Sequence, residues 1–489
     1  MKEEAGIHIR NILLGSLIFL YVLLLAPNLP ESYRILIKGN AILLSSIYFV
    51  LLIISLYLYK GSTKVAVYIF FLLSLIFYAQ RIVFLYIFPE SIRYARTVNY
   101  TTSDINTALL YLLICTIAVF IGFKAGEFIP LKKGNSKESK WLPKWMYSES
   151  SRMKFYIVSL CVYLIRIIMS VYYQHTAEGA LLNTRITQSF VMKLVLHLLF
   201  YFNFVQLIIF IILLHPDIRR KTKENITILI IFALLMLTSL SQGSKAAVIS
   251  IALSYFVVKI MLENYTFKKK TLALVLIIML TFPVMAPLSV SVRTSIILGV
   301  KSMDQFSRIF KKASQGYIDD LIANSSRLGG VDWLAVAVSE DKKDELRGCV
   351  NPSSLGEDAA RRLIPVPNLF PDKPNMLQKY TTVVWKLPRE EISKVTELPT
   401  FLGVTYLLFG YFAFFVVFLW GMISVIVMRS NISLVLKVLF FQHLVIQLFL
   451  GGDIVESVKA FFMAVFILWL IKLAIAPGYK LEVAAQKGL

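Results

Sequence analysis

Two arginines stand inside apolar runs, and their guanidinium groups indicate the first chemistry to consider. Arg81 occurs in FYAQRIVFLY and Arg166 in VYLIRIIMS. A charge within a membrane span is costly and usually faces a cavity or a partner, although a long side chain near a span end can also reach the interface. Guanidinium binds phosphate and carboxylate bidentately. We therefore predict that Arg81 and Arg166 bind an anionic, phosphate-bearing substrate.

A tight hairpin in SLSQGSKAAVIS, residues 239–250, offers a second arrangement suited to anions. Gly243 and Ser244 are small enough to let the backbone approach a ligand, and Lys245 stands at the head of the following helix. Free amides at a helix N-terminus favour an anion. The alternative interpretation is a turn with an interfacial lysine.

A large polar segment, about 291–400, carries further cations beside aromatic residues. Arg293 begins it, and Arg327 precedes Asp332 and Trp333. Both arginines are predicted to bind the same anionic substrate. Trp beside acids and Arg is a common composition of sugar sites, but Trp and Tyr are equally common interfacial anchors. The predicted glycan-binding residues are Trp333, Arg361, Lys373 and Tyr380.

An attacking hydroxyl needs a general base within hydrogen-bond reach. The carboxylates available in the polar segment are Asp332, Glu357, Asp358, Glu391 and Glu397. His175 is the only histidine in a predicted outer loop. We predict Asp332, His175 and Glu397 as catalytic residues, with a solvated surface position as the alternative for each acid. The sequence leaves the choice among them open.

Several common kinds of site have no motif in this chain. Walker, G-x-G-x-x-G, H-E-x-x-H and G-x-S-x-G patterns do not occur, which disfavours ATP-driven transport and ordinary hydrolase chemistry. The three cysteines show neither CxxC nor Cys/His metal spacing. We expect neither a metal nor a cofactor.

These residues are set in a chain whose composition is that of a membrane protein. Its 489 residues are 57% hydrophobic and 16% charged, with a mean hydropathy of +0.71, whereas a soluble domain has about 25% charged residues. Apolar runs of about 17–25 residues, enough to cross a bilayer, recur along the chain. The first run lacks a small-residue cleavage site and is expected to remain as an anchor.

We predict an all-α polytopic protein with about twelve spans. They cover about 12–27, 41–59, 65–88, 104–123, 155–173, 194–214, 226–241, 246–262, 271–290, 401–426, 432–450 and 457–476. The basic connections then fall on one side, so the net charge of +22 reflects the positive-inside rule rather than nucleic-acid binding. Both termini are predicted to be cytoplasmic.

The predicted domains are 1–290 with spans one to nine, an outer cap segment 291–400, and 401–489 with the last three spans and a tail. Thirteen of the eighteen arginines lie outside or in the outer halves of spans. Helical spacing in SRIFKKASQGYIDDLIANSSRLGGVDWLAVAVSE predicts short amphipathic helices in the cap. The Pro-rich LIPVPNLFPDKPN predicts extended or turning backbone. No internal repeat of the transporter type is found.

Taken together, these residues resemble the Wzy-type repeat-unit polymerases, which make O-antigen, enterobacterial common antigen and exopolysaccharides in bacteria. The resemblance covers roughly 160–470 and rests on the Gly-Ser-Lys hairpin, the long outer segment, IPVPNLFPDKPN at 364–375, and PTFLGVTYLLFGYFAFF at 399–415. The chain departs from the family pattern at Lys245, where Arg is usual, and at Phe370, where Trp is usual. The final hairpin has Asp453, Glu456 and Lys459 where relatives often carry an Arg.

The resemblance implies a GT-C-like glycosyltransferase in the bacterial inner membrane. The reaction would be metal-independent, with a glycan on undecaprenyl diphosphate as donor and another lipid-linked unit as acceptor. Arg side chains and the hairpin amides would bind the diphosphate, and a carboxylate or His175 would deprotonate the hydroxyl. Membrane lipids are expected partners, a chain-length regulator of the Wzz type is a candidate partner, and nucleic acid is not expected.

Two other functions stay open. An O-antigen ligase of the same superfamily usually has a histidine in its large outer loop, and 291–400 contains none. A flippase or transporter of lipid-linked glycans tends to have a charged central cavity and short outer loops, which the long outer segment disfavours. We therefore expect a polymerase.

Overall fold

The computed structural model is helical throughout the part of the chain that it describes, in which no strand occurs. It describes residues 40–59, 63–79, 81–82, 101–130, 142–172, 201–241, 246–263, 302–315, 330–362, 376–385 and 400–475, with a few short stretches between 287 and 300. Helix covers the described residues of the predicted spans except for a few at span ends, so the all-α fold class is confirmed. Predicted span 12–27 and most of 271–290 lie outside the described residues.

Four helices in the described ranges are long and apolar enough to cross a membrane. They are α2 (Ala41–Leu58), α6 (Thr102–Phe128), the continuous stretch Phe401–Arg429 and α23 (Ile454–Ile475). The stretch Phe401–Arg429 consists of α19 (Phe401–Phe409), η9 (Gly410–Phe412) and α20 (Ala413–Arg429). Each of the four overlaps a span predicted from the sequence.

Shorter apolar helices complete this part of the bundle. They are α3 (Thr63–Ser74) continued by the π-helix η3 (Leu75–Ala79), α9 (Val205–Leu214), and α21 (Leu434–Phe440) continued by the π-helix η10 (Phe441–Gln447) and α22 (Leu448–Gly451). Gly452, with φ of +64°, ends α22 and turns the chain into α23. A left-handed residue at a helix C-terminus is commonly Gly because it has no Cβ.

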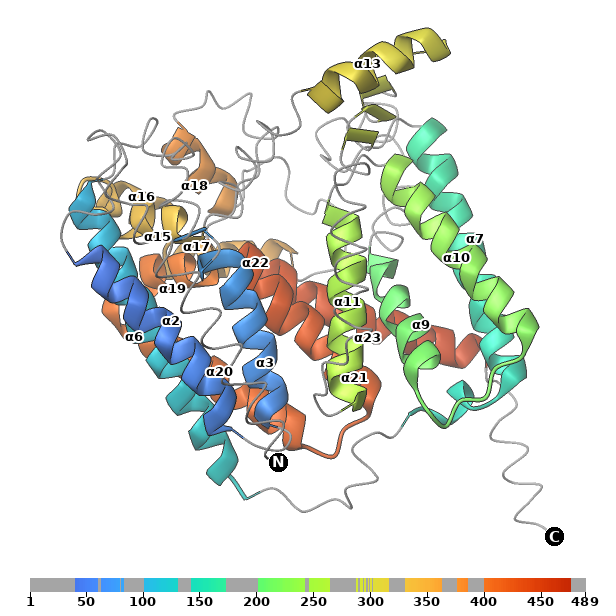
Figure 1. Ribbon diagram of the computed structural model, residues 1–489, viewed down its shortest axis with the longest axis horizontal. Helices are drawn as coiled ribbons and strands as arrows, with labels where there is room; N and C mark the ends of the chain where they lie inside the picture. The colour runs from blue at the N-terminus through green and yellow to red at the C-terminus, as the bar shows by residue number, and fades with distance from the viewer. Residues whose placement is uncertain are drawn as a thin grey trace.

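Two longer helices, α7 (Glu149–Tyr172) and α10 (Thr222–Ser241), run side by side at one edge of the bundle (Figure 1). The bundle also contains α11 (Ala246–Glu263) beside α9, and the short turns η6 (Lys144–Met146) and η7 (Tyr201–Phe204). The positions of α7, α10 and α11 agree with the apolar runs predicted at 155–173, 226–241 and 246–262.

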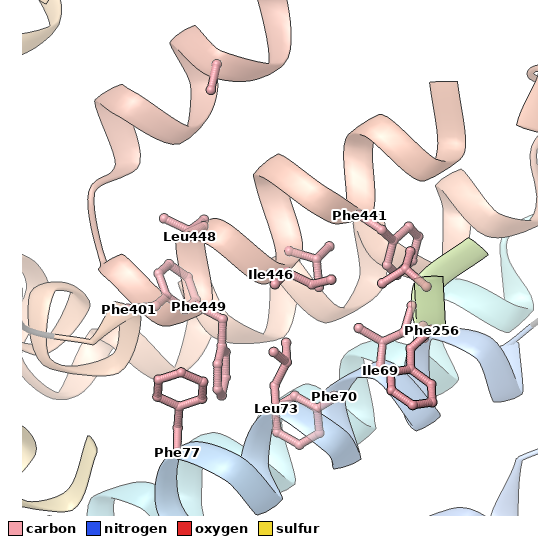
Figure 2. Packing of buried hydrophobic residues seen from close by; sticks show 14 of the residues in the cluster. Ile69, Phe70, Leu73, Phe77, Phe256, Phe401, Phe441, Ile446, Leu448 and Phe449 are labelled. Atoms are coloured by element: carbon pink, nitrogen blue, oxygen red, sulfur yellow. The ribbon is translucent and has the colours of Figure 1, made fainter. Parts of the chain in front are cut away.

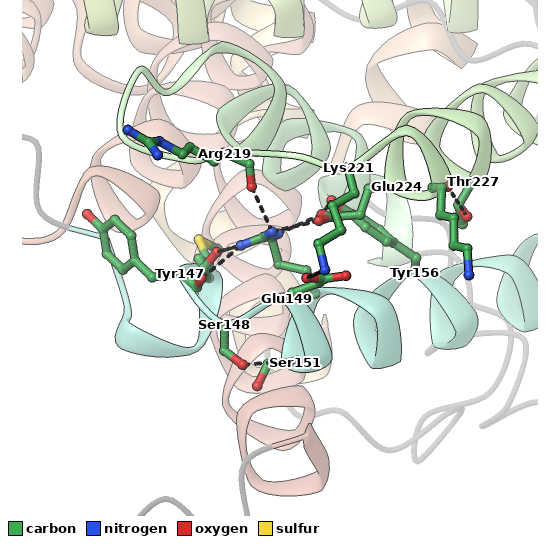
Figure 3. Close-up of polar contacts among 12 residues, drawn as sticks. Tyr147, Ser148, Glu149, Ser151, Tyr156, Arg219, Lys221, Glu224 and Thr227 are labelled. Carbon is green, nitrogen blue, oxygen red and sulfur yellow. Dashed lines mark hydrogen bonds and ion pairs between the residues drawn. The ribbon is translucent and has the colours of Figure 1, made fainter.

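A buried ion pair ties the N-terminal ends of α7 and α10 together. Arg152 donates from Nε and Nη2 to the two oxygens of Glu224, each at 2.7 Å. Its remaining donors bind the carbonyls of Met146, Tyr147 and Arg219 (Figure 3). Burial alone would raise the pKa of Glu224, but the bonds from Arg152 hold that pKa below its usual value. This arrangement fixes the two helices to the loop before each of them.

The core between α3, α6, α20 and α22 is rich in aromatic rings (Figure 2). Phe70 lies at its centre, with ring centroids 5.8 Å from Phe449, 6.2 Å from Trp420, 5.7 Å from Phe120 and 6.0 Å from Phe123. All four contacts have edge-to-face geometry, which suits the ring quadrupole. The segment after the cap is therefore packed directly against the N-terminal part of the bundle.

Helices α6 and α20 approach each other closely because glycines stand at their crossing. A Cβ added at Gly122 would overlap the carbonyl oxygen of Phe418, and one added at Gly421 would stand 2.8 Å from the carbonyl oxygen of Val119. Gly122 and Gly126 form a GxxxG pattern in α6. Small residues at this spacing allow membrane helices to pack backbone to backbone.

Five short helices lie in the described residues between 302 and 385, within the predicted cap segment. They are α13 (Met303–Gln315), α15 (Gly330–Val338), α16 (Lys343–Cys349), α17 (Pro352–Arg362) and α18 (Met376–Trp385). We call α15 to α18 the cap helices, since they gather at one end of the bundle (Figure 1). Here α15 packs on α6, α19 and η3, and α17 packs on α23.

The short helices predicted in this segment are present, but α15 differs from the expected amphipathic character. All nine of its residues are buried, including Asp332. It is enclosed by other helices on every side, and Asp332 is tolerated there because it has a charged partner. The Pro-rich stretch 363–375 lies outside the described residues.

Candidate functional site

The site begins with a buried ion pair that joins the cap helices to the bundle. Arg81 follows η3, and Asp332 lies in the first turn of α15. Arg81 Nε donates to Asp332 Oδ2 at 2.7 Å, and Nη2 lies 2.6 Å from the same oxygen. Both side chains are 1% exposed. The sequence predicted a phosphate ligand at Arg81 and a base at Asp332, and the structure pairs them with each other.

This pairing depends on a close approach of α15 to η3. A Cβ added at Gly330 would stand 2.7 Å from the ring of Tyr78 and 3.1 Å from the carbonyl oxygen of Phe77. The widened π-helical turn of η3 lies directly before Arg81. π-Bulges are frequent at functional sites. Gly330 therefore lets α15 come near enough for Asp332 to meet Arg81.

The pair limits what either residue can do in this conformation. Within a low-dielectric site each charge compensates the other, and opening the pair would leave both charges buried without that compensation. The contact occupies Nε and Nη2 of Arg81 and Oδ2 of Asp332, so these atoms can bind a phosphate or accept a proton only when the two side chains separate. In the observed arrangement the ion pair holds α15 of the cap against the bundle.

Two of the predicted glycan-binding residues also lie together. The rings of Trp333 on α15 and Tyr380 on α18 are 5.8 Å apart between centroids and tilted by 46°. Both side chains are fully buried. They join two cap helices to each other, and a sugar could stack on them only if the cap helices moved apart.

A second charged cluster lies where α17 meets the last hairpin. Arg362 Nη2 donates to Asp453 Oδ2 and to Glu456 Oε2, each at 2.9 Å, and Nη1 donates to Asp453 Oδ1 at 3.2 Å. The three side chains are 21%, 17% and 23% exposed. Burial lowers the pKa of Arg362, but its two carboxylate partners outweigh this and hold the pKa above its usual value.

This cluster gives the acids of the last hairpin a cationic partner. The arginine comes from the cap, 91 residues earlier in the chain at Arg362. Asp453 also accepts the backbone N–H of Glu456 at 2.9 Å, which caps the start of α23. Lys459, one turn further on, is buried close to Glu456.

The two neighbouring acids on α17 have different surroundings. Glu357 pairs with Arg361 and, at 4.0 Å, with Lys379 on α18. Asp358 accepts the backbone N–H of Met376 at 2.8 Å, and burial raises its pKa. A carboxyl with a raised pKa is closer to the range suited to proton transfer at neutral pH. Among the carboxylates in the described cap, Asp358 has the environment best suited to a base.

Arg166 is buried on α7 beside Tyr163. The principal packing partner of α7 is α10, whereas the η3 turn before Arg81 contacts α15. The two predicted phosphate ligands thus lie on elements with different neighbours. The remaining predicted site residues lie outside the described residues, namely His175, Glu397, Lys245, Gly243, Ser244, Arg293, Arg327 and Lys373.

Sequence reasoning did not select His443, which lies in the π-helix η10. Its Nδ1 is 2.8 Å from Gln447 Oε1, and its Nε2 is buried with no hydrogen-bond partner among the described residues. It is close enough to Glu456 to interact electrostatically. The signal that could have found it is a histidine inside an apolar run, since an ionisable residue there is a functional candidate by default.

No family model, no curated protein and no solved structure matches this chain. Among the residues described, no group of three or more His, Cys, Asp or Glu side chains is placed to hold a metal ion. The feature of the described residues that bears most directly on function is the attachment of the cap helices to the bundle by charged side chains.

Proposed function

We propose that the protein joins oligosaccharide repeat units carried on undecaprenyl diphosphate, on the outer face of the bacterial inner membrane. It does so as a twelve-span, GT-C-like glycosyltransferase with both termini in the cytoplasm, the donor and acceptor both being lipid-linked, and with no metal or cofactor. The cap segment 291–400 forms the lid of the site. A chain-length regulator of the Wzz type is a candidate partner.

One observation carries this proposal: charged residues fasten the cap helices onto one end of an apolar helical bundle. Arg81 pairs with Asp332, and Arg362 pairs with Asp453 and Glu456. A lid fixed in this way suits an enzyme that must enclose a reacting headgroup while its lipid tail stays in the bilayer. A flippase needs no folded cover at one end of its helices.

The residues divide into positioning and reacting groups. Arg362 and the Arg81–Asp332 pair are positioning residues, because they hold α17 and α15 in place on the bundle. The diphosphate is bound by Arg166, Lys245, Arg293 and Arg327 with the amides around Gly243 and Ser244, and Arg81 joins them when its pair opens. Arg361 and Lys373 bind the glycan, and Trp333 and Tyr380 support it from beneath. The base is Asp358, or one of His175 and Glu397.

Reconstitution tests the reaction directly. Purified protein in vesicles that contain lipid-linked repeat units should give a ladder of longer glycans on gel analysis, without added lipid A core. Products that appear only with lipid A core would indicate a ligase instead. Transbilayer movement of the substrate with no ladder would indicate a flippase, and either outcome overturns the proposal.

A matched pair of variants tests the role of the cap. Arg362→Ala leaves two carboxylates without their arginine, so we expect polymer output to fall by at least about tenfold, which corresponds to about 1.4 kcal/mol. Lys342→Ala removes a partly exposed cap cation at the N-cap of α16, which pairs with Glu345 of the same helix, and should stay near wild type. The thermal unfolding midpoint in detergent, measured alongside, separates loss of activity from loss of fold. Equal output from the two variants would contradict the positioning role.

A further inference from the structure

Helix α13 is separate from both the bundle core and the cap helices. In Figure 1 it lies beyond the ends of α7 and α10, and its axis runs across the view while theirs run along the bundle. Among the described residues, none of the apolar residues of α13 belongs to the hydrophobic core cluster or packs against it. In this view α13 thus runs across the direction of α7 and α10, as a helix lying on a membrane surface would.

One face of α13 is apolar along its whole length. At 100° per residue, the apolar side chains fall within one sector of the helix, and they are Met303, Phe306, Ile309, Phe310 and Ala313. Met303 is 79% exposed, and the other four are partly exposed. An apolar face of this kind is unfavourable in water and needs an apolar surface to cover it.

The opposite face is cationic. Arg308, Lys311 and Lys312 are all exposed there, and Asp304 is the only acid in the helix. An excess of cations beside an apolar stripe is the pattern of helices that lie in the headgroup layer of anionic membranes. A partner protein would have to match both the apolar stripe and the charge, whereas a membrane surface is already present beside this chain.

We propose that α13 binds the surface of a bilayer that contains anionic phospholipid. The apolar face enters the boundary between headgroups and acyl chains, and the three cations contact the lipid phosphates. This anchors the start of the cap segment to the same membrane that the bundle crosses. The inference requires only that the chain spans a membrane, so it stands or fails independently of the transfer reaction.

Depth measurements on the full-length protein test this proposal. In a Cys161→Ser, Cys349→Ser background, only Cys115 remains, and it is buried in α6. Phe310→Cys places a fluorescent label on the apolar face, and Gln305→Cys places it on the polar face as a matched control. The labelled proteins are reconstituted into phosphatidylcholine vesicles with or without phosphatidylglycerol, and lipid-borne spin labels near the headgroup serve as quenchers.

With phosphatidylglycerol present, we expect the label at position 310 to be quenched several-fold more than the label at position 305. Adding Arg308→Glu, Lys311→Glu and Lys312→Glu should abolish this difference, because the charge complementarity is reversed. Equal quenching at the two positions in anionic vesicles would overturn the proposal. So would a label at position 310 that is shielded from water but untouched by lipid quenchers, since that result would indicate a protein partner or a second copy of the chain.

Discussion

At the scale of single residues, the charged groups of this protein act in pairs that join distant parts of the chain. Arg81 and Asp332 are 251 residues apart in sequence and share a buried contact. The sequence placed Arg81 in an apolar run and Asp332 in the polar segment, but no local pattern could show that each was the other's partner. Residue type was predictable, and pairing was not, because pairing depends on how α15 packs on η3.

A double-variant cycle tests the Arg81–Asp332 pair. Arg81→Met leaves Asp332 buried without its ion-pair partner, so we expect a loss of about 3–5 kcal/mol in stability. The double variant Arg81→Met, Asp332→Leu removes both charges and should recover most of that loss, since apolar replacements of a buried pair are often tolerated. Unfolding in detergent provides the measurement. The single variant Asp332→Leu completes the cycle. If the double variant loses as much stability as the two single variants lose together, the Arg81–Asp332 contact is not the dominant interaction of either side chain.

The Arg152–Glu224 pair, at the N-terminal ends of α7 and α10, predicts that the stability of the protein depends on pH. The pKa of Glu224 is lowered in the folded protein, and its unfolded value is about 4.3. The stabilisation is therefore fully present above that unfolded value and is lost as the pH falls through the folded one. We expect the gap in unfolding temperature between wild type and Glu224→Gln to be constant near neutral pH and to shrink below about pH 4.

The exposed pair Lys221–Glu149 serves as the control for this measurement. Its side chains are 70% and 44% exposed, and ion pairs exposed to this extent contribute little to stability because water and salt screen them. Lys221→Ala should therefore change the unfolding temperature little at any pH. A gap between wild type and Glu224→Gln that stays unchanged down to the acid limit of folding would contradict the assignment.

At the scale of elements, apolar runs predicted where helices lie, because lipid-facing helices must be long and apolar whatever they pack against. They did not predict the π-helical turns in η3 and η10, which arise from packing rather than composition. They also did not predict the complete burial of α15. Its sequence, GVDWLAVAV, is too short to show a period, and its burial follows from contacts with α6, α19 and η3.

Two glycines in different surroundings, Gly122 at the crossing of α6 and α20 and Gly356 on α17, are expected to respond in opposite ways to substitution by alanine. Gly122→Ala would overlap the backbone of α20, and we expect a loss of about 1–3 kcal/mol from overpacking. Gly356→Ala lies in exposed helix with nothing within 4 Å of the added Cβ, and it should gain up to about 1 kcal/mol from helix propensity. Thermal unfolding of both variants in detergent checks the signs. A neutral Gly122→Ala would mean that the two helices are not held at backbone contact.

At the scale of the whole molecule, the proposed function depends on where the cap helices lie relative to the membrane. Basic connections between the apolar runs predict that the cap segment is outside. The structure adds that α15 to α18 are fastened to one end of the bundle, so they must all lie on the same side. The side of the membrane on which one cap residue lies is therefore the side on which all four cap helices lie.

Cys349 on α16 is a native reporter for this question, since it is partly exposed while Cys115 is buried and Cys161 lies in a predicted span. Burial raises the pKa of the Cys349 thiol, so a membrane-impermeant maleimide should be applied at mildly alkaline pH to sealed right-side-out membrane vesicles. Cys349→Ser gives the background, and Lys221→Cys places a thiol on the side predicted to be cytoplasmic.

We predict that Cys349 is labelled in sealed vesicles and that the thiol of Lys221→Cys is labelled only after the membrane is permeabilised. Labelling of Cys349 only after permeabilisation, with the thiol at position 221 reacting from outside, would place the lid on the cytoplasmic side and contradict glycan transfer on the outer face.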